Sequence, residues 1–172
     1  MPATTPIAGS KRGGSALIEF SLLGIPLIFV ILSVMAASLN MWQLHSLAYS
    51  VDTTARYVVA HGNVCTQTGN TCTVTLGNIA TLMRQQSGAL DASLYNVTFT
   101  SSSGSIGCNP LNTCTSNATT WPPNADNAIG NDISIVGYYT LVNPIMIFWP
   151  DGNKIAAARF TVSATARERI VF

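Results

Sequence analysis

The strongest constraint in this chain is a run of apolar residues near its start. From Ala16 to Leu39 the sequence reads ALIEFSLLGIPLIFVILSVMAASL, and its only charged residue is Glu19. At a rise of about 1.5 Å per residue, a helix of this length crosses the roughly 30 Å hydrocarbon layer of a membrane. The run therefore predicts one membrane-spanning helix.

The charges that flank this run predict its orientation. Lys11 and Arg12 precede it, and the first charges after it are Asp52 and Arg56. Because basic residues stay on the cytoplasmic side of a span, we expect the N-terminus in the cytoplasm and everything after about Leu39 outside it.

The helix is expected to continue beyond the membrane. Apolar residues recur with helical spacing from Leu44 to Val59, and His61 and Gly62 are typical of a helix end. Pro26 removes one backbone hydrogen bond, which membrane helices tolerate. The predicted parts are a basic leader (1–14), a transmembrane and stalk helix (15–61) and an exported head (62–172).

The head is predicted to be a small α+β unit. Its pattern favours one short helix and a roughly three-stranded antiparallel sheet, with a loop over 101–123. The apolar segment 144–150 is either an exposed partner surface or a plug at the sheet edge. The expected helix covers 78–86, and the expected strands cover 94–100, 133–141 and 159–165.

Several classes of function find no support in the composition. Charged residues make up only 9% of the chain and the net charge is +1, without a basic patch for nucleic acid. No nucleophile–base pair, metalloprotease motif or phosphate loop is present, so we expect no enzyme, cofactor or small-molecule substrate. His45 and His61 fit no metal-ligand pattern. The aspartates stand among Asn and Gly, where turn chemistry explains them better than catalysis; they are Asp91, Asp126, Asp132 and Asp151.

Four cysteines follow the apolar run, in two close pairs. Cys65 precedes Cys72, and Cys108 precedes Cys114, within polar sequence typical of an oxidising compartment. Four cysteines allow three connectivities, and free or metal-bound thiols are a further alternative. We favour the two local disulfides because each would close a short loop bounded by Gly, Asn or Pro.

Glu19 needs an explanation, because an ionised acid at the centre of a membrane helix costs about 2.5–3.5 kcal/mol, and less near the end. It is either a tolerated charge at the membrane edge or a functional group. A secretory signal peptide explains neither its presence nor the length of the run.

The segment from Lys11 to Phe20, KRGGSALIEF, resembles the processing site of type IVb pilins of the Flp/Tad class. In that family a prepilin peptidase cuts after Gly, and a Glu and an aromatic residue follow at mature positions five and six. The resemblance implies cleavage between Gly14 and Ser15. It also implies that Glu19, next to Phe20, pairs with the N-terminal amine of a neighbouring subunit, an amine that Ser15 would carry.

The rest of the chain looks like the TadE-like minor pilins of the same system. The matching segments are 55–62, the Tyr138-Tyr139 pair followed by Pro144, and 163–169. The two cysteine pairs do not map onto the family pattern.

The resemblance implies a minor pilin-like structural subunit that acts in pilus assembly, at its initiation or at the filament tip, in adhesion and surface attachment. Its partners would be other major and minor pilins, the prepilin peptidase and the pilus assembly platform. Its location would be the bacterial inner membrane with a periplasmic head, then the pilus and cell surface. The alternative is a single-span or secreted extracytoplasmic binding domain outside any filament, for which Ala36-Ala37-Ser38 offers a cleavage site.

Overall fold

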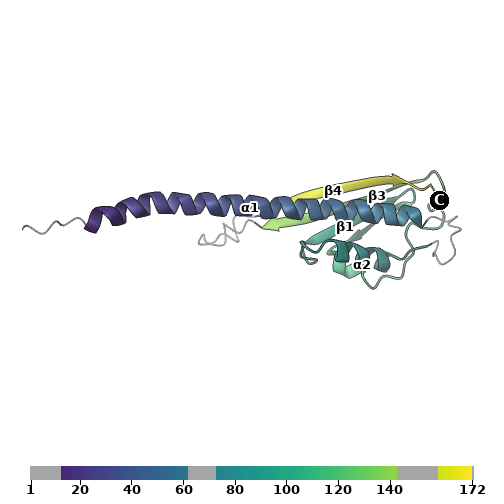
Figure 1. The fold of residues 1–172 in the computed structure, drawn as a ribbon. Helices are drawn as coiled ribbons and strands as arrows, with labels where there is room; N and C mark the ends of the chain where they lie inside the picture. Colours follow the sequence, from purple (N-terminus) through teal and green to yellow (C-terminus); the bar gives the residue numbers. More distant parts are fainter. Residues whose placement is uncertain (1–12, 62–72, 143–158, 172) are drawn as a thin grey trace, which may run out of the picture.

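The computed structural model describes residues 13–61, 73–142 and 159–171. A long helix emerges from a head that contains the other elements (Figure 1). This is the α+β architecture that the sequence predicts. The elements in chain order are α1 (Gly13–Ala60), α2 (Leu76–Gln86), β1 (Tyr95–Ser101), β2 (Gly104–Cys108), the short 3-10 helix η1 (Leu111–Cys114), β3 (Asp132–Val142) and β4 (Arg159–Arg169).

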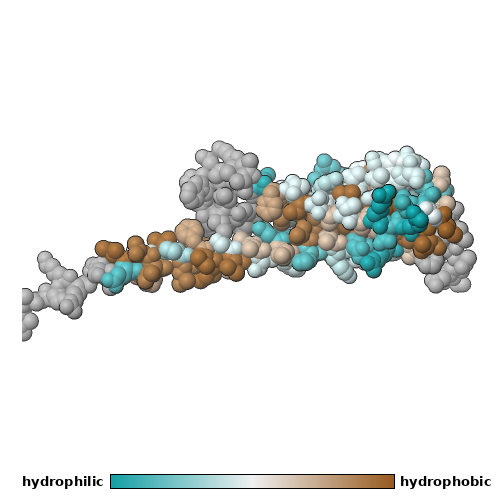
Figure 2. All heavy atoms as spheres, turned by 90° about the horizontal axis from the view of Figure 1, so that it is seen from above, coloured by the Kyte–Doolittle hydropathy of each residue, from teal (hydrophilic) through white to brown (hydrophobic). Residues whose placement is uncertain are grey.

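The first half of α1 stands clear of the head and is apolar all round. Most leucine, isoleucine, valine and phenylalanine side chains from Leu17 onwards are more than half exposed, Leu32 is half-buried, and the exposed apolar series ends near Trp42. Figure 2 shows this half as an almost continuous apolar surface, whereas the head presents mixed and polar surface. Only 6% of the most apolar stretch is buried, so this is not the core helix of a soluble domain. By length and composition, α1 is able to cross a membrane.

The few polar groups of this half are accommodated within the helix itself. Ser21, Ser33 and Ser38 each donate a hydrogen bond to a backbone carbonyl three or four residues earlier, at 2.7–3.0 Å. Helix α1 also continues through Pro26 without ending. Internal bonding of this kind removes the cost of placing serine hydroxyls in hydrocarbon.

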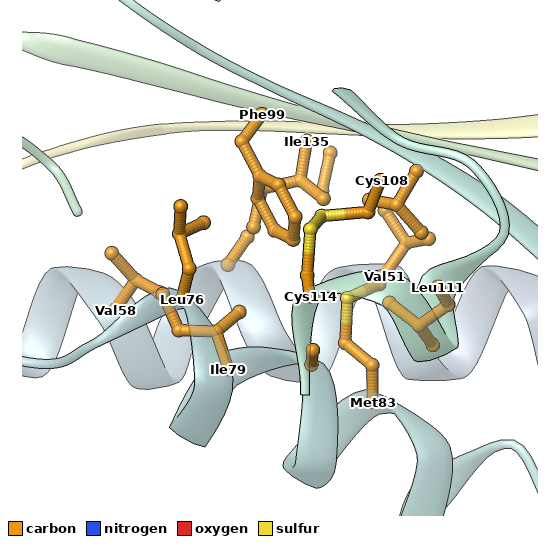
Figure 3. Packing of buried hydrophobic residues seen from close by; sticks show 14 of the residues in the cluster. Val51, Val58, Leu76, Ile79, Met83, Phe99, Cys108, Leu111, Cys114 and Ile135 are labelled. Carbon is orange, nitrogen blue, oxygen red and sulfur yellow. A yellow bond between two sulfur atoms is a disulfide. The ribbon is translucent and has the colours of Figure 1, made fainter. Parts of the chain in front are cut away.

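The second half of α1 changes from all-round exposure to one buried face. Leu47, Val51, Ala55 and Val58 recur at three- or four-residue spacing and are at most 1% exposed. They pack against apolar side chains of α2, β1 and β3 (Figure 3). The predicted packing stripe is thereby confirmed in its main positions, although Ala48 within it is exposed.

The four strands form one antiparallel sheet in the order β2-β1-β3-β4. Side chains alternate between its faces, so that Tyr95, Val97 and Phe99 of β1 are buried while Asn96 and Thr98 are half-buried. Helix α1 packs on β3 and β4, and α2 packs on α1 and η1. One face of the sheet is therefore covered, and the other is rich in Thr, Ser and Tyr.

A hydrogen bond between α1 and β1 lies inside this core. The Ser50 hydroxyl donates to the carbonyl of Leu47 at 3.0 Å, which leaves the Tyr95 hydroxyl to donate to the Ser50 oxygen at 2.9 Å. Burial raises the pKa of Tyr95 to about 12, although the bond to Ser50 opposes that shift. The phenol therefore stays neutral, and it satisfies the polar group that α1 turns towards the core.

The sheet has four strands where the sequence predicts roughly three, because β2 lies within the region predicted as a loop. Strand β2 reads GSIGC, and Ile106 is its only large apolar residue. It pairs with β1 through a tight connection, with Val97 opposite Cys108 and Ser101 opposite Gly104. A strand made mostly of Gly and Ser shows no alternation of apolar and polar residues, so the period-two signal is absent.

Gly137 of β3 marks a close approach between the sheet and α1. A Cβ atom built there would lie 2.8 Å from Val51 Cγ2 and 3.1 Å from both Leu47 Cδ1 and Tyr95 Cε2. Val51 has little freedom to move away, because a β-branched side chain in a helix is nearly confined to one rotamer. Only glycine therefore lets α1 lie this close to β3.

We predict that Gly137→Val destabilises the head by about 1–3 kcal/mol, the usual range for overpacking a core. Urea unfolding of the full chain with Trp42→Phe and Trp149→Phe in detergent micelles, followed by the fluorescence of buried Trp121, measures the change. Gly107→Val is the matched control, because a Cβ at that position in β2 meets nothing within 4 Å. Equal stability of the two variants would contradict the close packing of α1 on β3.

Candidate functional site

The N-terminal end of α1 carries the residues predicted for processing. Gly14 and Ser15 lie in its first turn, which begins at Gly13. The N–H groups of a first turn have no partner within the helix, and each glycine lowers helix stability by about 1 kcal/mol relative to alanine. The peptide bond between Gly14 and Ser15 therefore lies where α1 unwinds most easily.

Glu19 and Phe20, predicted for subunit recognition, lie about one turn further along, and both are exposed. The Phe20 ring lies 3.8 Å from the place where a Cβ of Gly24 would be, so it packs over the missing side chain. The resulting shallow groove has a volume of ≈ 380 Å³. Its lining residues are Glu19, Phe20, Leu23, Gly24 and Leu27.

This groove is suited to another apolar helix. A small residue lets two helix backbones approach closely in a membrane, and Gly24 provides one here. A carboxylate at the rim of an apolar groove favours a partner that brings a cation or a hydrogen-bond donor. The sequence pattern predicts a role for Glu19 and Phe20 but not for Gly24, whose signal is its position one helical turn after Phe20.

The disulfide between Cys108 and Cys114 is present in the structure. Their Cα atoms are 5.7 Å apart, and both residues are buried, at 0% and 5% exposure. The bridge joins the end of β2 to η1 and lies among apolar side chains such as Leu111 and Met83 (Figure 3). Cys65 and Cys72, the other predicted pair, lie outside the described residues.

The segment that follows the disulfide completes the start of α2. The carbonyls of Thr119 and Asn117 accept hydrogen bonds from the N–H groups of Leu76 and Gly77, both at 2.8 Å. Thr75 adds a side-chain cap, since its Oγ1 accepts from Asn78 N at 3.3 Å. The N–H groups that a helix start leaves unpaired are thereby satisfied, and the disulfide loop has a clear structural role.

Asp91 and Asp126 act in turns and connections, as predicted, whereas Asp132 at the start of β3 pairs with Arg169 of β4. The Asp91 carboxylate accepts hydrogen bonds from the Ser93 N–H and hydroxyl, which hold its pKa below the usual value. The Asp126 carboxylate does the same for Ser103 at 2.7 Å, again with a lowered pKa, and so ties the β1–β2 turn to the loop before β3. Asp151 lies outside the described residues, as does the apolar segment 144–150.

A second hollow of ≈ 380 Å³ opens at the end of the sheet where β3 begins, beside Asp132, Ser134 and Arg167. Asp132 accepts a hydrogen bond from Arg169 Nε at 2.9 Å, and Arg167 Nη2 lies 4.0 Å away. The Arg169 guanidinium holds the pKa of Asp132 below its usual range. A carboxylate kept ionised in this way is poorly suited to proton transfer at neutral pH.

Within the described ranges, no group of three or more His, Cys, Asp or Glu side chains is arranged to hold a metal ion. A scan against protein-family models, a search of curated proteins and a search of solved structures each found no match to this chain. The assignment of function therefore depends on the sequence pattern and on the geometry of α1 and the head.

Proposed function

We propose that this chain is a minor pilin-like structural subunit of a Tad-type (Flp) type IVb pilus, which is processed by a prepilin peptidase. The observation that carries the proposal is the division of α1. Its first half exposes apolar surface on every side, with Glu19 near the start, and its second half is part of the head's core. A filament subunit needs both parts: a stalk that packs among other stalks and a head fixed to that stalk.

The groove beside Glu19 supports this role. Cleavage after Gly14 would give Ser15 a free amine, which is cationic at neutral pH because its reference pKa is about 7.7–8.0. The resemblance to Flp/Tad pilins implies that such an amine pairs with Glu19 of a neighbouring subunit. The apolar lining beside Glu19 and the small Gly24 are compatible with a neighbouring stalk in that groove.

The proposed location follows from the same features. The leader would lie in the cytoplasm, α1 in the bacterial inner membrane and the head in the periplasm, before transfer to the pilus or cell surface. The buried Cys108–Cys114 disulfide is compatible with an oxidising compartment for the head. Major and minor pilins, the prepilin peptidase and the assembly platform would be its partners.

The first test is the N-terminal residue of the protein isolated from its host. We expect Ser15 for the wild type and an unprocessed, slower-migrating precursor for Gly14→Leu, because a bulky side chain hinders access to the scissile bond. Gly13→Leu is the matched control and should still be processed. An N-terminus at Met1 or Pro2 would instead indicate an uncleaved anchor, and one at Leu39 a secreted binding domain; both contradict the proposal.

The second test removes only the charge of Glu19. We expect Glu19→Gln to be inserted and processed normally but to be lost from complexes with other pilins, because removing one partner of a buried ion pair costs about 3–5 kcal/mol. Co-purification and counts of pili measure the loss. Ser33→Ala, in the same exposed half of α1, is the control. If Glu19→Gln assembles like the wild type, Glu19 is a tolerated edge charge.

A further inference from the structure

We infer that the end of the sheet nearest the anchor lies in the lipid headgroup layer while the chain is in the membrane, with Phe160 and Arg159 in contact with phospholipid. The inference rests on the membrane-anchored state of the proposed function, but it concerns a surface of the head to which the pilin proposal assigns no role. Its partner is the bilayer that α1 crosses. Three observations carry it: the continuity of α1, the direction of the strands and the exposure of these side chains.

The continuity of α1 fixes the height of the head. The apolar run of α1 leaves the hydrocarbon at about Leu39, and the headgroup layer adds roughly 5–8 Å on that side. This layer therefore extends along α1 to about Trp42. Helix α1 is unbroken from there to the core residues Leu47 and Val51. The head is thus held at a set distance from the membrane.

Because of the directions of strands β3 and β4, one end of the sheet lies at the height of the headgroup layer. Figure 1 shows that β3 runs towards the free half of α1 and that β4 runs away from it, so the end of β3 and the start of β4 face the anchor. Gly137 of β3 lies beside Leu47 and Val51. Leu141 is four residues further, or about 13 Å at 3.3 Å per residue. That distance corresponds to about nine residues of helix, which places Leu141 near the level of Asn40.

The side chains at this level suit a lipid interface. Phe160 is the strand partner of Leu141, and 45% of its surface is exposed although it belongs to the core-facing series of β4. Arg159 beside it is exposed, as is 61% of Trp42 on α1. Aromatic rings are enriched at the headgroup level of membranes, and a guanidinium binds phosphate through two hydrogen bonds. In water, 45% of the Phe160 surface would face solvent.

The test uses tryptophan fluorescence of the full chain in phosphatidylcholine vesicles with brominated acyl chains. The background is Trp42→Phe with Trp149→Phe, which keeps buried Trp121, and its quenching is measured separately. The reporter is Phe160→Trp. The control is Val171→Trp, an exposed position just beyond the opposite end of β4, and Val30→Trp reports on the anchor itself. Lipid brominated near the headgroup and lipid brominated in mid-chain distinguish the depths.

We expect Val30→Trp to be quenched by both lipids, Phe160→Trp to be quenched mainly by the lipid brominated near the headgroup, and Val171→Trp to keep its fluorescence. Quenching of Val30→Trp without quenching of Phe160→Trp would overturn the inference and leave the anchor intact. Absence of quenching for Val30→Trp would overturn the anchor and the inference together. Equal quenching of Phe160→Trp and Val171→Trp would show a head lying on its side, which contradicts the fixed height.

Discussion

The structure depends on one helix that has two kinds of surface. Along α1 the exposed apolar surface gives way, between about Leu39 and Leu47, to a single buried stripe within the head. No residue in that interval interrupts the helix. Because the helix is unbroken, the direction of its exposed apolar half sets the orientation of the head relative to that half.

The head in turn depends on α1 for its stability. Helix α1 packs on β3 and β4, and without it those strands would expose their apolar face. Few residues are available to replace that cover, because small domains bury a limited fraction of their surface. The Cys108–Cys114 bridge and the capping of α2 by the segment that follows it hold the remaining elements around this helix. The fixed geometry of the head is therefore a consequence of packing on the stalk.

Much of this fold is predictable from local patterns, and the exceptions have physical reasons. The apolar run, the stripe from Leu44 to Val59 and the alternation in β1 and β3 all reflect which side chains avoid water. Strand β2 escaped prediction because its pairing depends on the tight connection to β1 and on the buried Cys108, neither of which changes the hydrophobic period. A glycine also gives no sign of what approaches it, so the contact of Gly137 with Val51 required the assembled fold.

The candidate site, too, contains some residues that the sequence predicts and others that only the folded structure reveals. A carboxylate in an apolar run is conspicuous in sequence, so Glu19 stands out by itself, whereas the role of Phe20 is implied only by the resemblance to the Flp/Tad processing site. Gly24 does not stand out, because its role depends on the Phe20 ring lying over it and on the groove that this creates. The disulfide pair Cys108–Cys114 was predictable from its short loop, whereas its role next to the start of α2 was not, since that contact joins segments distant in the chain.

The central claim is that α1 passes unbroken from the anchor into the core of the head. Amide hydrogen exchange of the full chain in lipid nanodiscs measures this directly, since amides in a stable helix exchange slowly even where water reaches them. The account predicts continuous protection through residues 40–46, the interval between the apolar surface and the buried stripe. Exchange in this interval as fast as in an unstructured peptide, with protection on both sides, would reveal a hinge and contradict the account.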